Sequence, residues 1–103
     1  MYNNIYELRT DIQTIISSEN VYFNPPEKHK ITYPAALIQL NDISTQHGSN
    51  IRYTSFYQYK ITLITLTEPL EFIKKILELP YCSYNTSFIS DKLYHTVFTI
   101  YIS

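Results

Sequence analysis

Two long runs of alternating apolar and polar residues, separated by a short amphipathic segment, most constrain how this chain can fold. One run extends from Tyr53 to Leu66 and the other from Leu93 to Ile102. A period of two places successive side chains on opposite sides of a strand. The residues expected to share a face are Tyr57, Tyr59, Ile61 and Leu63 in the first run and Phe98, Ile100 and Ile102 in the second. The two runs therefore predict long antiparallel strands with one wetter face.

Two other segments carry apolar residues at helical spacing. The first runs from Tyr2 to about Ser18, and the second begins near Thr67 and ends before Pro80, since proline cannot continue a helix. The apolar stripes are Ile5, Leu8, Ile12, Ile15 and Ile16 in the first helix and Leu70, Ile73, Ile76 and Leu77 in the second. The order of elements predicts one α+β domain over residues 1–103, a mostly antiparallel sheet flanked by two helices.

The remaining segments predict shorter strands and one long loop. Val21–Phe23 fits a short strand, and the nearly all-apolar Ala35–Leu40 fits a strand buried in the centre of the sheet. From Asn41 to Asn50, polar residues surround Gly48, the only glycine of the chain, and this composition predicts a long hairpin loop. A further short strand is expected around Phe88.

Composition narrows the classes of function. Eight basic and nine acidic residues leave a formal charge of −1, so no global field attracts nucleic acid, and specific nucleic-acid binding is not expected. A single glycine argues against a phosphate-binding loop. One cysteine allows no intrachain disulfide and fits a reducing compartment. We expect no membrane segment, since apolar runs are only a few residues long, and no cofactor.

Catalytic and metal-binding constellations are weak. Cys82, Asp91 and His95 are the only trio with the residue types of a thiol nucleophile, acid and base. His95 lies in a predicted strand and Cys82 follows a helix end, so structural roles are favoured. His29, His47, His95 and Cys82 show no metal-ligand spacing. The sequence therefore predicts neither an enzyme nor a metal site.

A row of tyrosines is the most suggestive feature for binding. Tyr53, Tyr57 and Tyr59 lie in one alternating strand, beside Arg52. Such rings pack under a helix, meet a protein partner, or stack on bases. Without a basic groove, base stacking is the least favoured of these three, and core packing and a protein interface stay open.

The chain resembles short proteins of the tailed-phage neck, called tail terminator or tail completion (head-tail joining) proteins. The residues that carry the resemblance are Leu79-Pro80-Tyr81-Cys82, Asp91-Lys92-Leu93-Tyr94-His95, Phe98-Thr99-Ile100-Tyr101, Tyr33-Pro34 and Tyr57-x-Tyr59. The resemblance implies a tail-terminator-like α+β fold. It also implies a noncatalytic virion protein, made in the bacterial host cytoplasm.

The resemblance further implies partners. Proteins of this family form a ring, typically of six copies, that closes the tail tube and joins it to the head-side connector. The partners expected are other copies of the chain, the tail-tube protein and the connector proteins, with the loop at 42–53 as the contact segment. The candidate interface residues are Asp42, Gln46, His47, Arg52, Tyr53, Tyr57 and Tyr59. Alternatives are another neck component, such as a head-tail adaptor or stopper, and a small phage-encoded protein-binding module.

Overall fold

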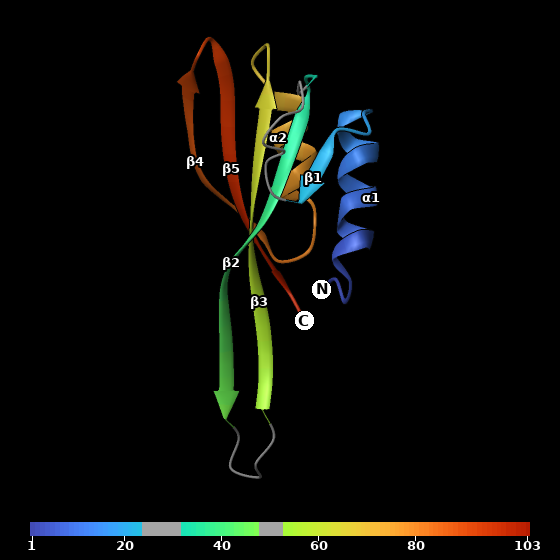
Figure 1. Ribbon diagram of the computed structural model, residues 1–103, viewed down its shortest axis with the longest axis vertical. Helices are drawn as coiled ribbons and strands as arrows, with labels where there is room; N and C mark the ends of the chain where they lie inside the picture. Colours follow the sequence, from blue (N-terminus) through green and yellow to red (C-terminus); the bar gives the residue numbers. More distant parts are fainter. Residues whose placement is uncertain (24–31, 48–52) are drawn as a thin grey trace.

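The computed structural model describes residues 1–23, 32–47 and 53–103, with the backbone alone described at 44–47 and 53–55. Along the chain the elements are α1 (Ile5–Ile16), β1 (Val21–Phe23), β2 (Ala35–His47), β3 (Tyr53–Thr65), α2 (Leu70–Leu77), β4 (Cys82–Ser90) and β5 (Leu93–Ile102). The strands form one sheet in the order β1-β2-β3-β5-β4, in which only β1 and β2 run parallel (Figure 1). The predicted α+β class, with a mostly antiparallel sheet and two helices, is confirmed.

Local capping sets the length of α1. The side chain of Asn4 accepts a hydrogen bond from the backbone N–H of Tyr6 (2.8 Å), and this bond satisfies one of the free donors at the helix start. The helix ends at Ser17, which adopts the left-handed conformation (φ 53°). The helix predicted from Tyr2 therefore starts three residues later, and Tyr2 forms a parallel bridge with Ile102 instead.

The buried face of α2 differs from the predicted stripe. Ile76 is fully buried and Ile73 packs partly against the core, as predicted, but Leu70 and Leu77 are exposed. Apolar residues occupy two overlapping helical stripes in this segment. Phe72, outside the predicted stripe, packs partly against the core and lies on the same side of the helix as Ile76 and the buried Pro69.

Both helices contribute to one core against one face of the sheet, which we call the helix-side face. Pairing across β2, β3 and β5 aligns Ile38, Ile61 and Phe98 on this face, and each is at most 1 % exposed. The core also includes Leu8, Ile12 and Ile16 of α1, Ile76 of α2, and Ile100 and Ile102 of β5. The predicted shared face of Phe98, Ile100 and Ile102 is thus confirmed. In the described part of the chain, no helix covers the opposite face.

The loop predicted from Asn41 to Asn50 was mostly wrong, because β2 continues to His47 and β3 begins at Tyr53. A β-bulge at Asn41 lets the ladder continue through polar residues. Within the described residues, β2 and β3 pair only with each other beyond Tyr57. We call the ribbon of residues 41–47 and 53–58 the arm. Its base at Tyr57 and Gln58 still pairs with β5, its outer part is two-stranded, and it extends away from both helices (Figure 1). The sheet order also makes β3, rather than β2, the central strand.

The strand expected around Phe88 is longer than predicted. It runs for nine residues as β4, at the edge of the sheet, and every residue after Cys82 is exposed. A two-residue turn joins β4 to β5, and both turn residues, Asp91 and Lys92, have positive φ values of 51° and 65°. This conformation is typical of a type I′ hairpin turn.

Candidate interaction surfaces

The helix-side face of the sheet continues past the helices onto the base of the arm. Ile43 lies opposite Tyr57, and Tyr57 lies opposite Ile102 of the core. Leu40 lies opposite Tyr59, whose ring packs partly against the core. Paired residues of antiparallel strands share a face, so these side chains extend the apolar face of the core. Leu40, Ile43 and Tyr57, 50 %, 50 % and 38 % exposed, are called the arm strip.

The bulge at Asn41 creates this strip. Without an extra residue, the period of two would place Leu40 and Ile43 on opposite faces, since they are three positions apart. On the other face, the Asn41 side-chain amide donates to Gln58 Oε1 (2.8 Å), and Gln58 Nε2 donates to the Tyr101 hydroxyl (2.9 Å). These bonds cross from β2 through β3 to β5 and hold the base of the arm to the body.

The predicted interface residues do not gather on one face. Tyr57 and Tyr59 share the helix-side face, as predicted, but only Tyr57 is exposed while Tyr59 is partly buried. Asp42 pairs with Gln58 on the opposite face, where its carboxylate accepts a hydrogen bond from the next backbone N–H (2.8 Å). Gln46, His47 and Tyr53 lie in the arm where only the backbone is described, and Arg52 lies outside the described residues.

The outer edge of β4 forms a second surface, which sequence reasoning missed. Its nine residues include no proline and no charged residue, although natural edge strands commonly carry such residues to prevent pairing with other chains. Tyr84, Phe88 and Ile89 are 49 %, 49 % and 65 % exposed, and we call them the edge cluster. The sequence signal that could have revealed this surface is the uncharged sequence of high β-propensity at Cys82–Ser90, next to a hairpin turn.

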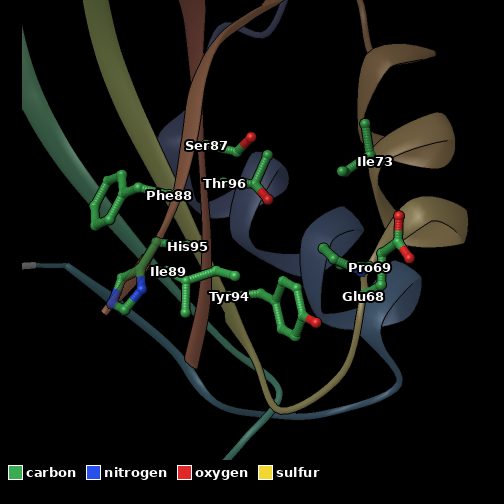
Figure 2. A pocket seen from close by; sticks show the side chains of 9 residues that line it. All are labelled: Glu68, Pro69, Ile73, Ser87, Phe88, Ile89, Tyr94, His95 and Thr96. Carbon is green, nitrogen blue, oxygen red and sulfur yellow. The ribbon is translucent and has the colours of Figure 1, made fainter. Parts of the chain in front are cut away.

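A groove of about 470 Å³ lies between the start of α2 and the β4–β5 hairpin. Figure 2 shows Ile73 and Pro69 on one wall and Ile89 and Tyr94 on the other, with the Glu68 carboxylate at one end. The remaining lining residues are Ser87, Phe88, His95 and Thr96. Apolar walls with hydroxyls and one carboxylate, and no lysine or arginine, suit a protein side chain better than a phosphate.

The rings of Phe88 and His95 point away from α2, onto the uncovered face of the sheet (Figure 2). They stack with centroids 4.8 Å apart and an interplanar angle of 9°. His95 Nδ1 lies 3.1 Å from the carbonyl oxygen of Leu93, within hydrogen-bonding distance. These contacts give His95 a packing role in the hairpin.

The structure does not assemble the candidate catalytic trio. Cys82 lies opposite Ile100 and His95 lies opposite Phe88. The two residues are therefore about five strand positions, or roughly 17 Å, apart along the hairpin. Asp91 lies in the turn. Burial raises the pKa of the Cys82 thiol from 9.0 to about 11, so little thiolate is available near neutral pH. Among the residues described, no group of three or more His, Cys, Asp or Glu is placed to hold a metal ion.

Taken together, the fold and these surfaces define a small α+β domain with an arm and an unprotected sheet edge. The chain matches no protein-family model, and no curated protein matches its sequence significantly. Within the described segments, no helix combines the length and apolar character needed to cross a bilayer.

Proposed function

We propose that this chain is a noncatalytic assembly protein of the tailed-phage neck, which forms a ring that ends the tail tube and joins it to the head connector. The arm strip is the observation that carries the proposal. A two-stranded ribbon is at best marginally stable in water. At the base of this one, where β3 still pairs with β5, three large apolar side chains are 38–50 % exposed on one face. Covering such a strip with another protein stabilises both the ribbon and the contact.

The sequence resemblance supplies the particular setting. The C-terminal series that carries it begins just after α2 and extends through β4 and β5, the strands that form one wall of the groove and carry the edge cluster. In this proposal the arm and the edge meet protein partners: other copies in a ring, typically of six, the tail-tube protein and the connector. The formal charge of −1 favours protein partners over nucleic acid.

Two alternatives use the same surfaces. A head-tail adaptor or stopper would also need an arm and an open edge to bind its neighbours. A small phage-encoded binding module would work as a single copy and use the groove and edge to hold a host protein. Formation of a ring, or copurification with the tail-tube protein, separates the neck proteins from the binding module.

The test is to silence this gene in the phage that carries it and to image the particles by electron microscopy. Overlong tails support a terminator, and tails detached from DNA-filled heads support a joining protein. Complementation with Ile43→Lys, at the arm strip, is expected to fail. Leu77→Lys, the same change at an exposed α2 position outside the arm strip, edge cluster and groove, is expected to restore infectivity. Normal infectious particles without the protein would overturn the proposal.

A further inference from the structure

Two strand edges of this protein lack a neighbour along most of their length in the described residues. The outer edge of β4 is unpaired over nine residues, at the end of the sheet order. On the other side of the sheet, β1 covers only Ala36–Ile38 of β2, so the edge from Gln39 to Ile43 has no strand beside it in the described segments. Unpaired backbone groups on a strand edge are templates for strand addition.

We propose that the arm of one copy adds to the β4 edge of the next copy as an extra strand. Its arm strip then lies beside Tyr84 and Ile89 of the edge cluster and beside the groove next to Ile89. The inference rests on the proposed ring and specifies the contact between its subunits. The occupant of the β4 edge is thus a second copy of this chain.

Strand direction and side-chain faces agree with this contact. Because β2, β3, β5 and β4 alternate in direction, β4 runs antiparallel to β2 within one copy. When a second copy is laid beside the first with its helix-side face on the same side, its β2 is antiparallel to the first copy's β4. The arm strip then lies on the side of the sheet that holds Tyr84, Ile89 and the groove.

The bulge at Asn85 contributes to this arrangement. Tyr84 lies opposite the buried Phe98, and Ile89 lies opposite Tyr94, which lines the groove. Five positions separate the two residues, so strict alternation would place them on opposite faces, and the extra residue at Asn85 returns Ile89 to the helix-side face. Each of the two contacting strands thus has one bulge that gathers exposed apolar side chains on the same side of the sheet.

The positions of the two surfaces favour a ring over a symmetric dimer. The arm and the β4–β5 hairpin turn lie at opposite ends of the molecule (Figure 1). A contact between different surfaces is head-to-tail, and it closes into a ring when the rotation between copies allows.

The contact area leads to the same arrangement. A half-exposed large side chain offers on the order of 100 Å², so the arm strip together with Tyr84 and Ile89, which lie on the same face, offers about 500 Å². A stable two-copy complex needs about 1,200–2,000 Å². Hydrogen bonds between the two backbones add to the area that the side chains offer, but a single contact is still weak. In a closed ring, each copy uses both of its surfaces, and the contacts reinforce one another.

The experiment compares the full-length chain with two variants by native mass spectrometry and light scattering. Ile43→Lys charges the arm strip and Ile89→Lys charges the edge cluster; both sites are at least half exposed, so the fold is retained and the melting temperature checks this. Each variant is expected to stay monomeric where the wild type assembles. A 1:1 mixture of the two retains one intact arm and one intact edge. At high protein concentration, where a single weak contact is occupied, the mixture is expected to form a dimer of twice the monomer mass without forming a ring.

Other outcomes overturn the contact. A ring that persists in either variant, as it should in the Leu77→Lys control, would place the subunit interface elsewhere while leaving the proposed function intact. Two monomeric variants that form no dimer on mixing at high protein concentration would exclude the arm-to-edge pairing. A wild-type dimer blocked by Ile89→Lys alone would indicate β4-to-β4 pairing. A wild-type chain that stays monomeric at high concentration also overturns the contact, and the particle phenotype then decides the proposed function separately.

Discussion

Replacing Phe98 by alanine tests the core most directly. Its ring is fully buried, lies opposite Ile61 in the sheet, and makes an edge-to-face contact with Tyr84 at a centroid distance of 6.4 Å. Truncating a buried phenylalanine removes its transfer free energy and leaves a cavity, with a combined cost of about 3–5 kcal/mol. A domain of this size has a total unfolding free energy of about 5–15 kcal/mol. Phe98→Ala is therefore expected to remove a large part of the stability, measured by urea unfolding followed by circular dichroism.

Phe88→Ala is the matched control. The same atoms are removed, but the ring is half exposed and its main contact is the stack on His95, worth about 0.5–1.5 kcal/mol beyond burial. The urea midpoint of Phe88→Ala should therefore move much less than that of Phe98→Ala, with similar slopes for both variants. Equal losses in the two variants, or a soluble Phe98→Ala protein with unchanged unfolding, would refute the assignment of Phe98 to the core.

Three further predictions concern local features. Lys92→Gly should raise the unfolding free energy by about 0.5–1 kcal/mol, because glycine adopts the left-handed conformation without the steric strain of a Cβ atom, and this gain exceeds its entropy cost. Lys92→Ala keeps the Cβ atom, so urea unfolding should show no gain in stability. Asn4→Ala should lower it by about 1 kcal/mol through loss of the α1 cap; a normal melting temperature would contradict that role. The contribution of Cys82 to stability should be constant below about pH 9 and fall towards pH 11, because the folded chain keeps the Cys82 proton that the unfolded chain loses. Burial and a hydrogen bond to Asp11 raise the pKa of Tyr2, which extends this fall in stability to higher pH. When the urea midpoint is plotted against pH, Cys82→Ala should make the curve flatter between pH 9 and 11.

The strongly periodic segments were predictable from sequence. The final strand was predicted from Leu93 to Ile102, which are its observed bounds, because Phe98, Ile100 and Ile102 recur at every second position. The stripe of α2 was harder to assign, since two apolar stripes overlap in an eight-residue helix. Helical periodicity alone does not distinguish Phe72 from Leu70. The choice depends on how the helix lies on the sheet, which is a property of the tertiary packing.

The surfaces were only partly predictable, and the reason is physical. Tyr57 was assigned to an interface from its alternation with its neighbours, but its partners Leu40 and Ile43 were placed in a buried strand and a loop. Local polarity at Asn41 and Asp42 favours a turn. In the folded chain, pairing of this segment with Gln58 on the neighbouring strand outweighs that local preference. Local sequence patterns do not reveal such pairing, because it joins residues far apart in the sequence.

The two bulges illustrate how assembly can be specified without a catalytic group. Asn41 and Asn85 each add one residue to a strand, and each thereby brings an apolar side chain, Ile43 and Ile89, to the helix-side face. A buried core alone would not require Ile43 or Ile89 on that face, because both are at least half exposed in the single copy. Deleting Asn41 removes the bulge, but it also leaves Leu40 and Ile43 two positions apart, so the period of two keeps Ile43 opposite Tyr57 on the helix-side face. If the proposed contact is correct, this deletion retains assembly, whereas Ile43→Lys, which keeps the bulge, abolishes it.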